Sequence, residues 1–164
     1  STILSALEFL KERLDLSDSA IDRGFMNVCE LTGLMGRWQI LKSKPLTVCD
    51  TGHNEHGIAE VARQLKARTN SGKLLCVMGF CGDKEFDKMV ALMPQDAHYI
   101  FTQASIRRAA SLDKIAEVAT ALSLDFELAE TVAEAIAKAK LQLTTNDMLF
   151  IGGSTFVVAE VLDL

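Results

Sequence analysis

A cluster of polar side chains lies where the chain reads Asp50-Thr51-Gly52-His53-Asn54. A short apolar run, residues 46–49, precedes the cluster, and apolar residues at helical spacing follow it from Ile58. The pattern predicts a strand, a turn and a helix, with the polar residues on the turn. In α/β sheets such turns lie at the carboxyl edge of the strands, where ligands bind. The cluster is therefore a candidate ligand site.

The same residues also have simpler interpretations. Asp50 could accept backbone N–H bonds and cap the turn, as Asx side chains often do. His53 and His56 are three residues apart and could in principle share a metal ion. No third nitrogen or thiolate ligand stands at a recognisable spacing, so the sequence predicts no metal site.

Short apolar runs alternate with amphipathic stretches beyond residue 36. Strands are predicted at residues 38–41, 46–49, 73–78, 98–102, 125–128 and 148–151, and helices at 56–68, 86–93, 112–121, 131–141 and 154–162. The nearly continuous hydrophobicity of the strands indicates burial on both faces, as in a parallel sheet. Residues 36–164 are therefore predicted to form a three-layer α/β domain with a doubly wound, mostly parallel, Rossmann-like sheet.

Two helical stretches, residues 2–13 and 19–28, precede this domain. Residues 31–37 contain two glycines and are predicted to form a loop or linker. We therefore expect residues 1–35 to be a helical tail plus linker. The sequence opens on Ser1 and not on methionine, directly before the first helical stretch, which suggests a part of a longer protein.

The overall composition excludes several classes of partner. The 164 residues carry 17 basic and 22 acidic side chains, a net charge of −5, with no basic stripe, which argues against nucleic acid. No apolar run approaches the ~18 residues of a membrane span. The four cysteines form no C-x-x-C pair and are expected to be reduced thiols. We expect a soluble, cytoplasmic protein.

No nucleotide-binding loop is predicted. The segment Asn70-Ser71-Gly72-Lys73 approaches a P-loop, but Ala67 stands where the first glycine belongs and Leu74 where a Ser or Thr would hold magnesium. Neither residues 79–82 nor residues 152–153 complete the G-x-G-x-x-G pattern of dinucleotide sites.

The segment Gly36-Arg37-Trp38-Gln39, followed by the Asp50–Asn54 turn, resembles the start of the C-terminal domain of folylpolyglutamate synthases and dihydrofolate synthases. These enzymes belong to the Mur ligase superfamily, and their strand ends in Asp-Gly-Ala-His-Asn. Residues 79–84, Arg108-Ala109 and residues 152–154 resemble further family segments. Thr51-Gly52 departs from Gly-Ala, and Met35 stands where the family often has proline, which puts local backbone shape in doubt more than chemistry.

The resemblance implies an ATP-dependent ligase that adds L-glutamate to dihydropteroate or a folate through an acyl phosphate. In the family a central domain supplies the P-loop, the Mg²⁺ ligands and the pterin pocket. Residues 1–35 would then be the helical tail of that missing domain, which the chain would pack against. ATP and Mg²⁺ are implied for the full-length enzyme, and the fragment alone is expected to be inactive.

The resemblance also implies roles for single residues. Arg37 and Asp50 match nucleotide-binding positions, Arg37 toward the phosphates or ribose and Asp50 toward the ribose hydroxyls; a guanidinium offers bidentate donors there. His53 and Asn54 match the face that meets glutamate. Ser154, at the opening of the last helix, could present its hydroxyl to a carboxylate or could be an N-cap. No catalytic residue and no metal ligand is assigned.

Two other functions remain open at this point. The chain could be the matching domain of another Mur-type amide ligase, acting on a peptidoglycan precursor or a polymer. It could also be a non-catalytic α/β binding or regulatory domain. A P-loop in the longer protein would exclude the second of these, and turnover of a pterin substrate would exclude the first.

Overall fold

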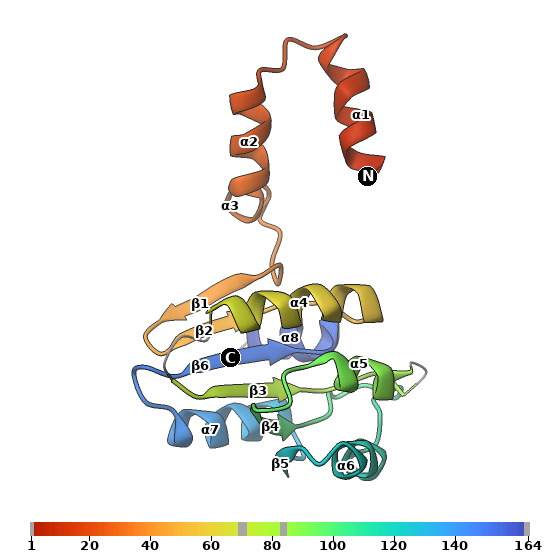
Figure 1. Cartoon of the computed structure of the whole chain (residues 1–164), viewed down its shortest axis with the longest axis vertical. Helices are drawn as coiled ribbons and strands as arrows, with labels where there is room; N and C mark the ends of the chain where they lie inside the picture. Colours follow the sequence, from red (N-terminus) through yellow and green to blue (C-terminus); the bar gives the residue numbers. More distant parts are fainter. Residues whose placement is uncertain (1, 69–71, 83–84, 163–164) are drawn as a thin grey trace. The chain divides into compact units, whose positions relative to one another are not determined.

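The protein divides into two compact units, residues 1–35 and residues 36–164. The computed structural model describes residues 2–68, 72–82 and 85–162. The first unit consists of α1 (Thr2–Lys11), α2 (Asp18–Met26) and α3 (Val28–Thr32) (Figure 1). Ser17 caps α2 by accepting a hydrogen bond from the N–H of Ala20 at 3.2 Å.

Two predictions for the segment around helix α3 were wrong. The stretch predicted as one helix over residues 19–28 breaks at Asn27, whose side-chain amide donates to the carbonyl of Arg23 at 2.9 Å and ends α2. The loop predicted from residue 31 begins later, because Gly33 adopts a left-handed φ of 69° and ends α3 after Thr32. The glycine therefore marks the end of a helix and not the middle of a loop.

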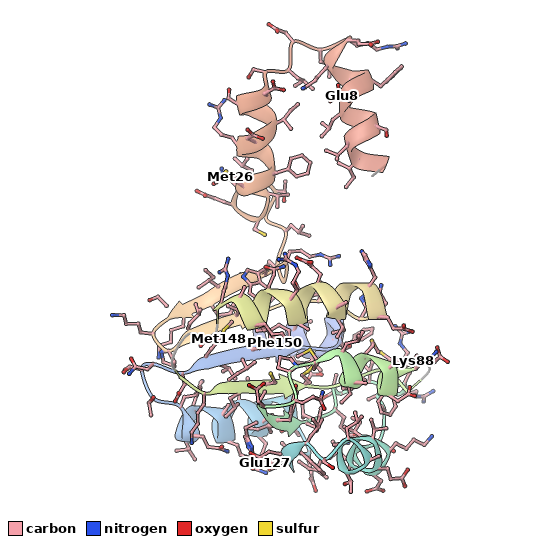
Figure 2. The ribbon with its side chains drawn as sticks, viewed as in Figure 1. Glu8, Met26, Lys88, Glu127, Met148 and Phe150 are labelled. Atoms are coloured by element: carbon pink, nitrogen blue, oxygen red, sulfur yellow. The ribbon has the colours of Figure 1, made fainter. Side chains whose placement is uncertain are left out.

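The first unit buries little of its apolar surface. No residue of α2 or α3 is buried, and Met26, labelled in Figure 2, is 85% exposed. The exposed large hydrophobic side chains of this unit are Ile3, Leu4, Phe9, Leu10, Leu14, Phe25, Met26, Val28, Leu31, Leu34 and Met35.

The second unit is built on a six-stranded sheet with the order β1-β2-β6-β3-β4-β5. The strands are β1 (Gln39–Ser43), β2 (Leu46–Cys49), β3 (Leu74–Met78), β4 (His98–Phe101), β5 (Asp125–Leu128) and β6 (Met148–Gly152). The five strands from β2 to β6 all run parallel to their neighbours among these five, and β1 pairs with β2 in the antiparallel direction. The helices are α4 (Glu55–Arg68), α5 (Phe86–Leu92), α6 (Leu112–Ala121), α7 (Val132–Gln142) and α8 (Thr155–Leu162).

Helices cover both faces of the sheet, which confirms the predicted three-layer α/β fold. One face packs against α4, α5 and α6 through residues such as Leu65, Met89 and Ile115. The other packs against α7 and α8 through residues such as Ile136 and Val157. The central strands β3 and β6 are buried along their whole length, and β6 carries the labelled residues Met148 and Phe150 (Figure 2).

The order of the strands in the sheet places the carboxyl ends of three strands next to one another. Strand β6 lies between β2 and β3, so the turns that follow β2, β6 and β3 meet at one place on the carboxyl edge. The backbones approach closely there: a Cβ on Gly152 would lie 2.8 Å from the carbonyl oxygen of Asp50, and a Cβ on Gly79 would lie 2.4 Å from that of Thr102. This strand order forms a topological switch point, where ligands bind in open α/β sheets.

The first predicted strand, residues 38–41, is the one most in need of correction. Trp38 has a φ of 41° and lies outside the strand, which begins at Gln39. Strand β1 is an antiparallel edge strand, and three of its five residues are exposed, so it is not buried on both faces. The other strands and helices of this unit start and end within one residue of their predicted bounds.

Two segments named in the sequence lie partly outside the described residues. These are Asn70-Ser71 of the rejected P-loop segment and Asp83-Lys84 of the family match. Within the ranges 2–68, 72–82 and 85–162, no helix is long and apolar enough to cross a membrane.

Candidate functional site

A small cavity opens at the carboxyl edge, beside the turns that follow β2, β3 and β6. Its volume is about 270 Å³, and its lining residues are His53, Cys81, Met89, Arg108, Gly153, Ser154, Thr155 and Phe156. We call it the edge cavity. Two of the five predicted site residues, His53 and Ser154, line it although 101 positions separate them in the sequence (154 − 53).

Asp50 is bound to backbone on both of its carboxylate oxygens. Oδ2 accepts the N–H of Trp38 at 2.8 Å, and Oδ1 accepts the N–H of Gly52 at 2.7 Å. The N–H of Thr51 donates to the carbonyl of Gly36 at 2.8 Å, so the two segments are joined twice. The capped turn that was one interpretation of Asp50 is therefore present. The Asp50 carboxylate still has lone pairs that can accept a hydrogen bond from a further donor.

Arg37 is brought next to Asp50 by these bonds. It is exposed and lies between Gly36 and Trp38, which both contact the Asp50 turn. Gly36 has a φ of 71°, and a Cβ there would lie 2.7 Å from the Thr51 side chain, so the turn requires glycine. The two predicted nucleotide-binding residues thus occupy one small region of the surface.

His53 and Asn54 have different surroundings. The Nδ1 of His53 lies 3.0 Å from the carbonyl oxygen of Thr51 and donates to it, which leaves Nε2 as an acceptor in the neutral imidazole. Asn54 accepts the N–H of Gly57 at 2.8 Å and caps α4. Asn54 is exposed and is not among the residues that line the edge cavity.

Ser154 precedes α8 and is 3% exposed. Its hydroxyl oxygen accepts the N–H of Phe156 at 3.2 Å and lies 3.9 Å from the sulfur of Cys81. Gly153 has a φ of 85°, which turns the chain sharply from β6 into the helix. Ser154 is thus an N-cap and a cavity residue at once, so the two interpretations of the sequence are compatible.

Arg108 lines the same cavity, a role that was not predicted from the sequence. It lies on the loop between β4 and α6, and its guanidinium carbon is 5.0 Å from the ring centroid of Phe156. Its carbonyl accepts the N–H of Gly82 at 2.8 Å. Arg108-Ala109 was one of the segments that carried the family resemblance, but the distance in sequence between this loop and the Asp50 turn concealed their proximity.

The edge cavity is suited to bind a carboxylate. Arg108 supplies a permanent positive charge with several N–H donors. The amino end of α8 opens onto the cavity through Ser154 and Thr155, and the helix dipole favours negative charge there. His53 adds a nitrogen acceptor that could receive a hydrogen bond from an ammonium group. A small amino acid with a free carboxylate would satisfy all three.

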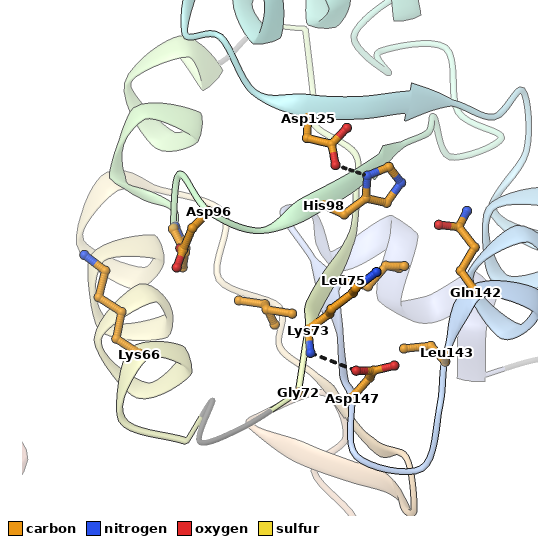
Figure 3. A pocket seen from close by; sticks show the side chains of 12 residues that line it. Lys66, Gly72, Lys73, Leu75, Asp96, His98, Asp125, Gln142, Leu143 and Asp147 are labelled. Carbon is orange, nitrogen blue, oxygen red and sulfur yellow. Dashed lines mark hydrogen bonds and ion pairs between the residues drawn. The ribbon is translucent and has the colours of Figure 1, made fainter.

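A larger cavity of about 910 Å³ lies at the opposite, amino edge of the sheet (Figure 3). Its main polar groups bind one another. His98 contacts Asp125 at 2.9 Å, and Asp147 accepts the N–H of Lys73 at 2.8 Å. The other ring nitrogen of His98 lies 3.3 Å from a carboxylate oxygen of Glu127. The polar groups do not converge on a ligand, so we do not assign a site here.

Among the residues that the structure describes, no three His, Cys, Asp or Glu side chains come together in a way that could hold a metal ion. We therefore assign no metal-dependent step to this chain's residues.

Comparisons with known proteins identify the domain. Residues 36–155 match the family described as Mur ligase, glutamate ligase domain. A probable bifunctional folylpolyglutamate synthase/dihydropteroate synthase of Haloferax volcanii is 30% identical over 149 residues, which cover 90% of this chain and 17% of the relative. The dihydrofolate synthase/folylpolyglutamate synthase of Escherichia coli is 26% identical, and the match covers 100% of this chain and 37% of that enzyme.

Solved structures of such enzymes share the fold. The bifunctional folylpolyglutamate synthase/dihydrofolate synthase of Yersinia pestis, complexed with AMPPNP and Mn ion, is 27% identical with a TM-score of 0.77; the match covers 92% of this chain and 35% of that chain. The same figures hold for a related structure with Mn, AMPPNP and L-glutamate bound. The chain thus spans about a third of these enzymes. It belongs to the Mur ligase family, in which it corresponds to the glutamate ligase domain.

Proposed function

We propose that this chain is the C-terminal domain of an ATP-dependent ligase that joins L-glutamate to dihydropteroate, to a folate, or to both. The observation that carries the proposal is the edge cavity, where Arg108, Ser154 and His53 converge in a domain of the glutamate ligase family. The names of the relatives, folylpolyglutamate and dihydrofolate synthases, support the folate acceptor.

In this proposal the cavity holds a carboxylate of glutamate. The Arg108 guanidinium and the amino end of α8 bind the negative charge, and Nε2 of His53 accepts a hydrogen bond from the amino group. The reaction forms an amide bond between the glutamate nitrogen and the activated acyl carbon of the folate, with phosphate as the leaving group. These residues orient the amine for attack, and correct orientation alone contributes greatly to rate. Asn54 would act through the helix that it caps.

Arg37 and Asp50 are proposed to bind ATP at the neighbouring turn. Arg37 is an exposed residue whose guanidinium can pair with phosphate oxygens, and the Asp50 carboxylate has lone pairs that can accept ribose hydroxyls. The Yersinia pestis structure with AMPPNP and Mn ion supports a nucleotide and a divalent cation in such enzymes. We propose Mg²⁺ in the living cell, held mainly by residues outside this chain.

Residues 1–35 are proposed to belong to the central ATPase domain of the complete ligase. Their many exposed apolar side chains, from Ile3 to Met35, favour a partner surface within the same protein. None of the four cysteines forms a disulfide bond, which fits the proposed reducing, cytoplasmic location.

Turnover by the ligase that contains this chain tests the proposal. We expect ADP formation that requires L-glutamate together with dihydropteroate or tetrahydrofolate. The 164-residue chain alone is expected to give no product, because phosphoryl transfer needs a phosphate cradle and metal ligands. No P-loop motif stands in the sequence, and the described residues do not bring together a set of metal ligands. Turnover with a peptidoglycan precursor and not with either pterin would favour the other Mur-type ligases. ATP- and glutamate-dependent product from the fragment would refute the division of labour proposed here.

A further inference from the structure

Helix α8 contacts the loop that carries Arg108. Residues 102–111 connect β4 with α6. Glu160 of α8 accepts the N–H of Ser105 at 2.6 Å through Oε1. Phe156 of the same helix lies under the Arg108 guanidinium at 5.0 Å. Two side chains of α8 therefore contact the loop at two points.

The spacing of these two side chains explains how they act together. Phe156 and Glu160 are four residues apart, so they project from the same face of α8. The other end of the loop is fixed to the turn after β3, where Gly82 donates to the carbonyl of Arg108 and Ala110 donates to that of Phe80 at 2.9 Å. These bonds fix the backbone of Arg108, and Phe156 contacts its guanidinium.

The same helix also begins at the edge cavity. Ser154 caps α8, and Thr155 and Phe156 line the cavity beside Arg108. One rigid element therefore carries the hydroxyl, the helix amino end and the aromatic support of the guanidinium.

We propose that Phe156 and Glu160 are positioning residues that hold Arg108 over the edge cavity and so set the affinity for the carboxylate of the incoming amino acid. This rests on the proposed function of the cavity. Phe156 supplies a cation–π contact that limits the directions open to the guanidinium. Glu160 fixes the first half of the loop through a charge-assisted hydrogen bond to backbone.

Nuclear magnetic resonance on the 164-residue chain tests the positioning without reference to activity. The ring of Phe156 should shift the side-chain protons of Arg108 upfield. We expect Phe156→Leu to remove this shift and Phe156→Tyr to retain it, while Val161→Ala on the same helix should leave it in place. An Arg108 spectrum that is identical in the wild type and in Phe156→Leu would overturn the proposal.

Steady-state kinetics of the complete ligase tests the consequence. Phe156→Leu should raise the KM for glutamate about two- to five-fold, the effect of one exposed cation–π contact, and leave the KM for ATP unchanged. Glu160→Ala should act in the same direction, and Glu160→Gln, which keeps the acceptor oxygen, should restore most of the loss. Glu117→Gln, an exposed carboxylate on α6, is the matched control.

A double-mutant cycle separates positioning from general damage. If Phe156 acts through Arg108, Phe156→Leu should have no further effect on the glutamate KM in an Arg108→Ala background. Additive effects would show a merely structural role and overturn the proposal. The proposed function of the cavity is tested separately, by comparing Arg108→Ala with the neighbouring control Arg107→Ala. If the two variants have the same KM for glutamate, the proposed function fails. The spectra of Arg108 then still decide whether Phe156 positions it.

Discussion

The carboxylate of Asp50 accepts a hydrogen bond from the backbone N–H of Trp38 at 2.8 Å, across twelve positions of sequence. Trp38 has a φ of 41°, in the left-handed region that non-glycine residues seldom adopt. The bond therefore stabilises a residue whose backbone is strained. Because Arg37 precedes Trp38 directly, the same bond also fixes the place of the proposed phosphate ligand.

Asp50→Ala should lower both stability and nucleotide affinity. The substitution removes the acceptors of two backbone N–H groups, and a hydrogen bond to a charged group contributes roughly 1.5–3 kcal/mol. We expect a lower urea midpoint for the 164-residue chain and a raised KM for ATP in the complete ligase. Glu117→Ala, at an exposed position on α6, serves as the control. An unchanged midpoint together with an unchanged KM would refute both roles of Asp50.

His53→Ala should affect glutamate more than ATP, because His53 lines the edge cavity. Loss of its hydrogen bond to a charged amino group should raise the KM for glutamate roughly ten-fold or more, at ~1.5–3 kcal/mol and 1.4 kcal/mol per decade. His56→Ala is the matched control, since His56 is exposed, three residues away and not among the cavity residues. Equal effects of the two substitutions would show that His53 has no special place in the site.

Much of this site was accessible from sequence because its signals are local. Asp50 and His53 stand on a strand-to-helix turn, whose place at the carboxyl edge follows from the order of strand and helix. Ser154 follows two glycines at the start of a helix, which marks a sharp turn. Arg108 was not predicted as a site residue because nothing in its own segment shows that it lies near Ser154. Arg108 follows β4 and Ser154 follows β6, and only the strand order β6-β3-β4 brings the ends of these two strands close together.

The errors in the fold have physical causes as well. Trp38 to Leu41 is apolar enough for a buried strand, but the backbone N–H of Trp38 donates to Asp50 and Trp38 lies outside the strand. Strand β1 lies at the edge of the sheet. The antiparallel direction of β1 follows from the short connection between Ser43 and Leu46, which can join only antiparallel neighbours. Periodicity alone contains neither piece of information.

The stability of the second unit should depend on pH through Asp147. Its carboxylate accepts bonds from the N–H of Thr144 at 2.7 Å, from the N–H of Lys73 and from the Thr144 hydroxyl. These bonds, those from the backbone of Thr144 first, lower the pKa of Asp147 below its ordinary value of 3.8. The folded state therefore binds the proton more weakly than the unfolded state, so this contribution is fully present above about pH 4 and is lost as pH falls through the folded pKa.

Asp147→Asn should remove that part of the acid sensitivity. We expect the urea midpoint of the variant to be lower than that of the wild type at pH 7, and the difference between the two to shrink as pH falls below about 4. Asp113→Asn, at an exposed position at the start of α6, is the control for the loss of one negative charge. A difference that stays constant down to pH 2 would show that the bonds of Asp147 do not depend on its charge.

The two units should differ in their resistance to hydrogen exchange. Strand β3 is buried at all five positions, whereas α2 and α3 have no buried residue. Amides of buried central strands exchange only on global unfolding, while segments with few buried apolar contacts open at a much lower free energy. In the 164-residue chain we therefore expect the amides of α2 to exchange orders of magnitude faster than those of β3. If residues 1–35 pack on a central domain, the same amides should slow in the complete ligase, and those of β3 should change little. Mass spectrometry of both proteins under identical conditions makes the comparison, and equal protection of α2 with and without the rest of the ligase would refute the proposed packing.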